Sequence, residues 1–162
     1  MRLSITLGVL VCIVGALATM VAGACLPARV VLRSLPKRIK ELTAEHPDPP
    51  VWRQALGYAG LVAWALVMLC AIAVTIRDAR ASGSGFMELL MRLLVIFGMW
   101  KATDIILLDW LLVSRVHFFA RFFPEMRGHE ELVAFGFNRA EQIRHTIGAI
   151  ACCVAIAWIF SR

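Results

Sequence analysis

Four long stretches of mostly apolar residues dominate the chain. Residues 5–26 and residues 55–76 contain no charged side chain, and about 20 apolar residues are enough for a helix to cross the hydrocarbon core of a bilayer. A third stretch covers residues 89–113, and a shorter fourth covers residues 143–160. The pattern predicts an all-α polytopic membrane protein, folded as an antiparallel bundle of four transmembrane helices.

The ends of these stretches leave two choices open. The fourth helix begins nearer Ala140 if Arg144 and His145 extend toward the headgroups. The end of the first stretch, from Ala22 to Cys25, resembles a signal-peptide cleavage site. Because the apolar run is longer than a usual signal core, we expect it to be a retained helix.

The connectors between the stretches are polar and differ in character. In residues 27–54, Val31, Leu35, Ile39 and Leu42 recur at helical spacing, which predicts an amphipathic helix on the membrane surface. An ordinary solvated helix is the alternative. Residues 77–85 contain Ser82-Gly83-Ser84-Gly85 and predict a flexible turn joining two antiparallel helices.

Composition supports a membrane protein and argues against nucleic-acid binding, a disulfide framework and a zinc site. The chain is 60% hydrophobic with a mean hydropathy of +0.78, above the roughly 45–50% apolar content of soluble domains. Its 162 residues are expected to form a single membrane domain. The net charge of +6 is explained by basic loops facing anionic lipid, and no nucleic-acid-binding motif accompanies it, so nucleic acid is not an expected partner. The five cysteines show no Cys-x-x-Cys spacing, so we expect helix-packing thiols and not a disulfide framework or zinc site.

The distribution of basic residues predicts the orientation. Most of the 17 lysines and arginines fall in the connectors 27–54 and 114–142 or at their helix ends, and few lie on the opposite side. Because basic loops are retained in the cytoplasm, we expect both large connectors to be cytoplasmic and both termini to lie outside.

The third apolar stretch carries an unusual load of charge. Lys101 and Asp104 are three residues apart, so their side chains can pair on one helix face, and Asp109 follows closer to the cytoplasm. Charged groups inside a membrane face the bundle interior and often mark a path for protons or ions. Structural hydrogen bonding between helices is the alternative for these three residues.

The connector after this stretch combines aromatic and basic side chains, a pattern typical of the headgroup boundary. We expect interfacial lipid contact from Arg115, Phe118, Phe119, Arg121, Phe122 and Phe123.

A possible ligand set lies in and after the same connector. It comprises His117, Glu141, Arg144 and His145, of which Glu141 and His145 share a helix face at i,i+4. The motifs of known helical metal sites are missing, so no metal site is expected. No motif identifies a cofactor.

Three functions are compatible with this pattern. The leading hypothesis is a noncatalytic subunit or lipid-contacting scaffold of a membrane complex, with lipids as partners and homo-oligomers or a larger assembly expected. Small residues, namely Gly8, Gly15, Gly23, Ala151 and Ala155, permit close helix approach. The second hypothesis is a proton- or ion-coupled transporter using Asp104 and Asp109. The third is a membrane enzyme acting on a lipid or hydrophobic substrate at the cytoplasmic interface, with Arg144 and His145 as candidate residues.

Overall fold

The computed structural model describes residues 1–129 and 135–161, and all regular structure within those residues is helical. Part of the predicted connector 114–142, residues 130–134, therefore lies outside the described residues. The elements are α1 (Arg2–Cys25), α2 (Ala28–Val31), α3 (Lys37–Leu42), α4 (Val51–Ala81), α5 (Phe86–Thr103), the π-helix η1 (Asp104–Arg115), the 3₁₀ turns η2 (Phe118–Arg121) and η3 (Pro124–Met126), and α6 (Arg139–Phe160).

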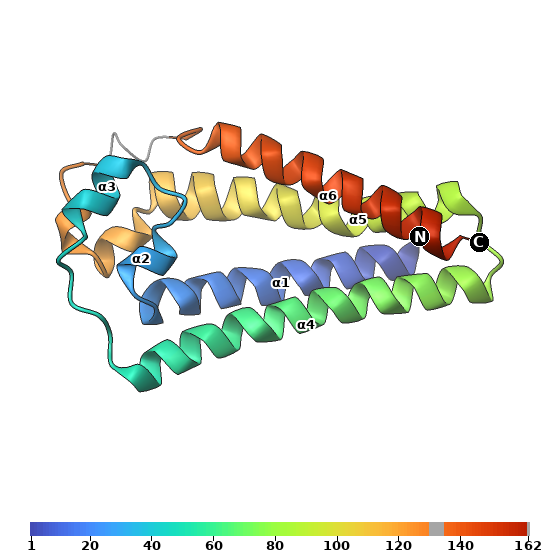
Figure 1. Ribbon diagram of the computed structural model, residues 1–162, viewed down its shortest axis with the longest axis horizontal. Coiled ribbons are helices and arrows are strands. Elements are labelled where there is room, and N and C mark those ends of the chain that lie inside the picture. Colours follow the sequence, from blue (N-terminus) through green and yellow to red (C-terminus); the bar gives the residue numbers. More distant parts are fainter. Residues whose placement is uncertain (130–134, 162) are drawn as a thin grey trace.

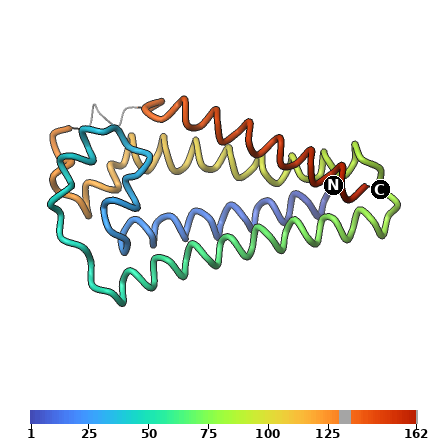
Figure 2. The backbone as a smooth tube through the Cα atoms, viewed as in Figure 1, coloured from blue at the N-terminus to red at the C-terminus, as the bar shows by residue number. Residues whose placement is uncertain are grey.

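Four long segments run lengthwise beside one another (Figure 1). They are α1, α4, α5 continued by η1, and α6. The α1 helix packs against α4 and α5, and α6 packs against α5. Both termini lie at one end with the α4–α5 turn, and α2 and α3 lie at the other end beside the chain that follows η1 (Figure 2).

Among the described residues, three helices are long and apolar enough to cross a membrane, namely α1, α4 and α6. At 1.5 Å per residue they are about 36, 46 and 33 Å long, which exceeds a hydrocarbon core of about 30 Å. The predicted helices 5–26, 55–76 and 143–160 are confirmed, and α6 begins early, at Arg139. The predicted span 89–113 is not among the three, because α5 carries Glu88, Arg92 and Lys101.

Hydroxyl groups inside the long helices bond to their own backbone. Thr19 Oγ1 donates to the Gly15 carbonyl at 2.9 Å, and Thr75 Oγ1 donates to the Ala71 carbonyl at 2.8 Å. A hydroxyl that bonds four residues back within its own helix needs no water. These threonines therefore fit an apolar environment.

Glycines on α1 allow its neighbours to come close. A Cβ at Gly15 would lie 2.2 Å from the Trp100 ring and 2.7 Å from Trp64 Nε1, and the two indole rings are 4.8 Å apart. Gly8 and Gly23 meet neighbouring side chains at similarly short range. The predicted role of these three glycines in close packing is confirmed. Ala151 and Ala155 are exposed on α6, so they do not contribute to packing within the chain.

The α4–α5 turn is shorter than the sequence predicts. Helix α4 continues to Ala81 instead of ending near Ile76, and the turn includes Gly83 at φ +64°. The added helical turn brings Asp78 to Arg92, whose guanidinium pairs with Asp78 Oδ2 at 2.5 Å and with Glu88 Oε1 at 2.6 Å. The pair between Asp78 and Arg92 thus connects the extended end of α4 to α5.

The two large connectors pack together into a separate hydrophobic core, which we call the connector core. Its buried residues are Ala28, Leu32, Leu35, Ile39, Val113, Phe119, Phe123 and Met126. The predicted single amphipathic helix is divided into α2 and α3, and Pro36 precedes the first turn of α3. Ile39 is directed into the connector core instead of a membrane surface. The interfacial placement of α3 stays a prediction.

A polar contact also joins the two connectors. His46 Nδ1 lies 2.9 Å from Glu125 Oε1, and the His46 ring meets the Phe123 ring edge-on at 5.0 Å. The hydrogen bond with His46 lowers the pKa of Glu125 below its ordinary value of 4.5. The connectors are therefore fixed to each other by both apolar and polar contacts.

Candidate polar site between η1 and α6

Lys101 and Asp104 pair as their spacing predicts. Lys101 Nζ donates to Asp104 Oδ2 at 2.9 Å, and the two side chains are 18% and 24% exposed. Both lie near the junction of α5 and η1. The opposite charges neutralise each other away from water, which lowers the cost of keeping them inside an apolar bundle.

Two amide side chains at the start of α6 bind Asp109, and one of them, Gln142, also connects it to this pair. Gln142 Oε1 accepts from Lys101 Nζ, while Gln142 Nε2 donates to Asp109 Oδ2 at 2.5 Å. Asn138 Nδ2 donates to the same Asp109 oxygen at 2.8 Å. We call the five residues Lys101, Asp104, Asp109, Asn138 and Gln142 the polar cluster.

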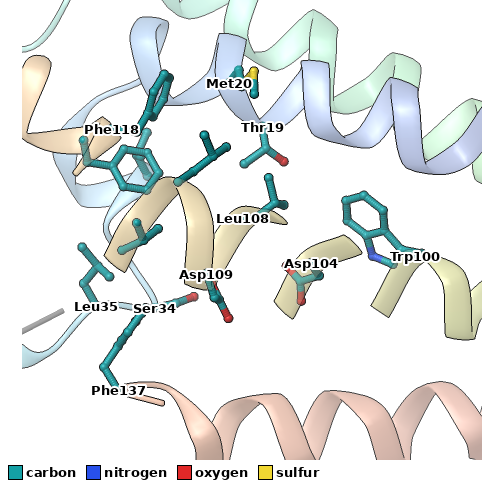
Figure 3. Close-up of a pocket in the computed structure, with 14 residues that line it drawn as sticks. Thr19, Met20, Ser34, Leu35, Trp100, Asp104, Leu108, Asp109, Phe118 and Phe137 are labelled. Carbon is teal, nitrogen blue, oxygen red and sulfur yellow. The ribbon is translucent and has the colours of Figure 1, made fainter. Parts of the chain in front are cut away.

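The π-helix explains why Asp104 and Asp109 lie on the same side of η1. In an α-helix, residues five apart differ by about 140° around the axis. In η1 the backbone bonds run from residue i to residue i+5, so residues five apart lie nearly above one another. Figure 3 shows both carboxylates on one side of η1, with Leu108 directed the other way toward α1. Ser114 Oγ reinforces this geometry by donating to the Asp109 carbonyl at 2.9 Å.

Cavities lined by described residues adjoin the polar cluster on several sides. The first, of about 180 Å³, lies between α1, the first connector and η1, and Asp104 and Asp109 both line it (Figure 3). The second, of about 580 Å³, lies between η1 and α6 and is lined by Asp109, Asn138 and Gln142 together with apolar side chains. The third, of about 360 Å³, lies between α5 and α6 beside Lys101 and Asp104.

The second and third cavities adjoin, because Thr146 lines both. We call these two cavities the α6 groove. Its apolar lining residues include Ile105, Ile143 and Ile147 in the second cavity and Leu94, Phe97 and Ile150 in the third. The groove therefore offers an apolar surface with polar groups at defined positions.

The predicted lipid-contact residues divide into two groups. Phe119 and Phe123 are buried in the connector core, and Phe118 and Phe122 pack against it. These rings hold the connectors together in the structure. Arg115 and Arg121 are exposed, and the Arg115 guanidinium lies 5.8 Å from the centre of the Trp110 ring. Lipid contact by this segment stays a prediction.

The predicted ligand residues are not brought together. His117 lies in the second connector with a left-handed backbone at φ +50°, whereas Glu141, Arg144 and His145 lie on α6. His145 Nε2 is 3.9 Å from Glu141 Oε1. His145 lines the third cavity, and Arg144 is exposed and lines neither part of the α6 groove. Within the described residues, no group of three His, Cys, Asp or Glu side chains has the geometry to hold a metal ion.

Sequence reasoning identifies the charged half of the polar cluster and misses the amide half. The missed residues, Asn138 and Gln142, are four apart and so share one face of the first turns of α6. That spacing is the only sequence signal for their role, and it is weak because amides are common near helix starts. The sequence analysis also misses the partners of Arg92, which are Asp78 and Glu88. Asp78 falls in the predicted turn 77–85, so no helical contact is expected from it.

The comparisons with known proteins assign no family. No protein-family model matches the chain, and neither a curated protein nor a solved structure matches it. The chain is thus described by its own sequence and geometry as an all-helical protein with three helices suited to a membrane.

Proposed function

We propose that the chain crosses a membrane four times, through α1, α4, the continuous segment α5–η1, and α6. The support comes from the connector core, in which residues before α4 pack against residues after η1. Two connectors in contact must lie on the same side of the bilayer, so an even number of crossings separates them. Helix α4 supplies one crossing, and α5–η1 then supplies the other.

The charges on α5–η1 are compatible with this proposal. Arg92 is 7% exposed and paired with Asp78 and Glu88, and Lys101 is paired within the polar cluster. Charged residues within membrane-spanning helices usually face the bundle interior and pair with one another. The outer surfaces of α1, α4 and α6 expose large apolar side chains, including Leu17, Leu66 and Ile147, as lipid contact requires.

For the orientation of the bundle in the membrane, we keep the prediction made from the charge distribution. The connectors would lie in the cytoplasm and both termini outside, because the connectors and their helix ends carry most of the basic residues.

Within that membrane frame, the function best supported is noncatalytic binding of a membrane amphiphile, as a lipid-contacting subunit or scaffold. The observation that carries it is the α6 groove, in which two adjoining cavities of about 580 and 360 Å³ have apolar walls and one polar side. Binding sites for small hydrophobic molecules have this composition of many apolar groups and a few placed polar ones.

Substitutions that fill the α6 groove with larger side chains test this function. The protein is purified from native-like membranes, and its bound lipids are measured by native mass spectrometry. A variant carrying Ile143→Trp and Ile147→Trp, one helical turn apart in the groove, should lose the bound amphiphile. The matched control carries Val62→Trp and Leu66→Trp on the exposed face of α4, where these residues are 58% and 56% exposed, and should keep it.

Two results would overturn the proposal. One is equal lipid occupancy in the filled variant and the control, and the other is a protein that retains no amphiphile at all. Turnover of a lipid by the purified protein alone would contradict the noncatalytic part.

A second candidate function is proton- or ion-coupled transport. The observation favouring it is that Asp109 lines both the second cavity and the first cavity, on the α1 side of η1. A carboxylate reached from two cavities is suited to passing a cation between them. In liposomes containing the protein, Asp104→Asn and Asp109→Asn should abolish any cation flux, and flux that persists unchanged in both variants excludes this pathway.

A further inference from the structure

We propose that the α6 groove selects a phospholipid whose headgroup carries both a primary amine and a phosphate, with the amine at Asp109 and the phosphate at Arg139. This inference rests on the proposed amphiphile-binding function and adds the chemical class of the ligand.

Asp109 is the anionic group of the second cavity, the part of the α6 groove between η1 and α6. Its Oδ2 accepts from Asn138 and Gln142, and both donors are neutral amides. Lys101, the nearest basic member of the polar cluster, pairs instead with Asp104. Among residues 1–129 and 135–161, no basic group lies within ion-pair distance of Asp109 and none of the hydrogen bonds reaches its Oδ1. A partly buried carboxylate that lacks a cationic partner is stabilised by a ligand that brings one.

Arg139 supplies the complementary charge in the same cavity. It is exposed, it is the first residue of α6, and it lines the second cavity with Asp109. A guanidinium binds phosphate through paired, charge-assisted hydrogen bonds. The start of a helix also carries a partial positive charge that favours an anion. The cavity therefore presents one anionic and one cationic group to a single ligand.

The positions of Asp109 and Arg139 along the bundle match the headgroup level of one membrane leaflet. Arg139 is the first residue of α6 and Asp109 lies in η1. The start of α6 and the segment after α5 lie at the end of the bundle nearest the connectors (Figure 1), where headgroups would be. From Arg139 to Ile150, the last residue of α6 that lines the groove, the helix is about 16 Å long. Half of the hydrocarbon core is about 15 Å thick. The apolar part of the groove thus matches the acyl region of one leaflet.

The headgroup chemistry separates common phospholipids. An ethanolamine ammonium can donate N–H bonds to Asp109, as a lysine ammonium would. A choline group carries the same charge but has no N–H to donate. A glycerol headgroup has no cation. The site should therefore prefer ethanolamine over both others.

The test is competitive binding to the full-length protein, followed by native mass spectrometry. Phosphatidylethanolamine, phosphatidylcholine and phosphatidylglycerol with identical acyl chains compete in detergent. We expect ethanolamine lipid to bind roughly tenfold more tightly than choline lipid, as one charge-assisted hydrogen bond provides. Asp109→Asn should abolish that preference, and Arg139→Gln should weaken binding of all three lipids.

Matched controls lie on the same helix. Glu141→Gln removes a carboxylate and Arg144→Gln removes a guanidinium, and neither residue lines the α6 groove. Both variants should retain the ethanolamine preference. If Asp109→Asn fails to fold, stepwise N-methylation of the ethanolamine lipid gives the same test on the unaltered protein, and affinity should fall as N–H groups are removed.

Equal affinity for the three lipids would overturn the inference, as would a preference that survives Asp109→Asn or full N-methylation. A different outcome is that the three lipids bind equally and yet all lose binding in the Ile143→Trp, Ile147→Trp variant. In that case the groove proposal stands and only headgroup selection fails. If no lipid binds, both proposals fail.

Discussion

The Gln142 side chain bonds to a cation and to an anion at the same time. Its carbonyl oxygen accepts from Lys101 and its amide nitrogen donates to Asp109, so one neutral side chain satisfies a cation and an anion. An amide can do so because it carries both a donor and an acceptor. At the scale of single residues, this one side chain connects α6 both to α5, through Lys101, and to η1, through Asp109.

Replacing Gln142 by leucine should therefore destabilise the protein. The change leaves the partly buried Lys101 and Asp109 groups without one of their partners, which costs about 1–3 kcal/mol. Unfolding in mixed detergent micelles measures the loss. Arg144→Gln, at an exposed position on the same helix, should change stability by less than about 0.5 kcal/mol, and equal stability of the two variants would show that Gln142 is not a link.

Glu125 makes the connectors sensitive to acid. Its pKa is lowered in the folded protein by the hydrogen bond with His46, so the unfolded chain binds the proton more readily. The stabilisation is complete above the ordinary value of 4.5 and is lost as pH falls through the lower folded value. Because the Glu125 side chain is 35% exposed, its contribution should not exceed about 1 kcal/mol.

Melting of the protein and of its Glu125→Gln variant checks this prediction. The variant should melt lower at neutral pH, and the two curves should converge as the pH falls below the ordinary Glu125 pKa of 4.5. Glu45→Gln, which removes an exposed carboxylate from the first connector, should follow the unchanged protein throughout. A gap between the Glu125 variant and the unchanged protein that is constant with pH would contradict the titration.

Sequence reasoning reaches the residues whose chemistry conflicts with their surroundings. Lys101, Asp104 and Asp109 stand out because charge is costly within an apolar run. Asn138 does not stand out, since a neutral amide beside a helix start has no such conflict. Pairing across helices needs their relative rotation, which a single sequence does not encode, and so half of the polar cluster is found only in the structure.

At the scale of elements, η1 departs most from the expectation of regular α-helices. Apolar periodicity predicts one α-helix over residues 89–113, whereas the structure has α5 to Thr103 and a π-helix from Asp104 to Arg115. The wider π turn is what aligns Asp104 with Asp109. Helix-period patterns are too coarse to distinguish the two, and long π segments are rare enough that no sequence rule expects them. Pro36 is a clearer signal, because proline is typical of helix starts, and here it is the residue immediately before α3.

Packing of α1 against α4 and α5 depends on the missing side chain at Gly15. A Cβ there would lie within 2.2 Å of the Trp100 ring and 2.7 Å of Trp64, so Gly15→Ala forces the two indoles to move. Such overpacking typically costs about 1–3 kcal/mol. Tryptophan fluorescence should shift, and the detergent-unfolding midpoint should fall.

Gly148→Ala is the matched control for Gly15→Ala. A Cβ at Gly148 meets nothing within 4 Å, and alanine is the better helix former by about 1 kcal/mol. This variant should be as stable as the unchanged protein or more so. If both variants behaved alike, the close approach at Gly15 would not contribute to stability.

At the scale of the whole molecule, the two ends of the bundle differ in kind. The end with the α4–α5 turn is held by the Arg92 ion pairs to Asp78 and Glu88, and by a small core around Leu89, Leu93 and Cys153 that packs α5 against α6. The opposite end is closed by the connector core. The sequence predicts both large connectors on one side from their basic residues, and the structure adds that they are in direct contact.

The side of the membrane on which each connector lies tests the account most directly. Single cysteines replace Glu45, Arg127, Ser82 or Ser161 in a chain whose five native cysteines have been substituted, and a membrane-impermeant thiol reagent is applied to intact and permeabilised cells. Four crossings predict that Glu45→Cys and Arg127→Cys are labelled only after permeabilisation, while Ser82→Cys and Ser161→Cys are labelled in intact cells. Labelling of Arg127→Cys from the same side as Ser82→Cys would mean that α5–η1 does not cross, and it would contradict the account.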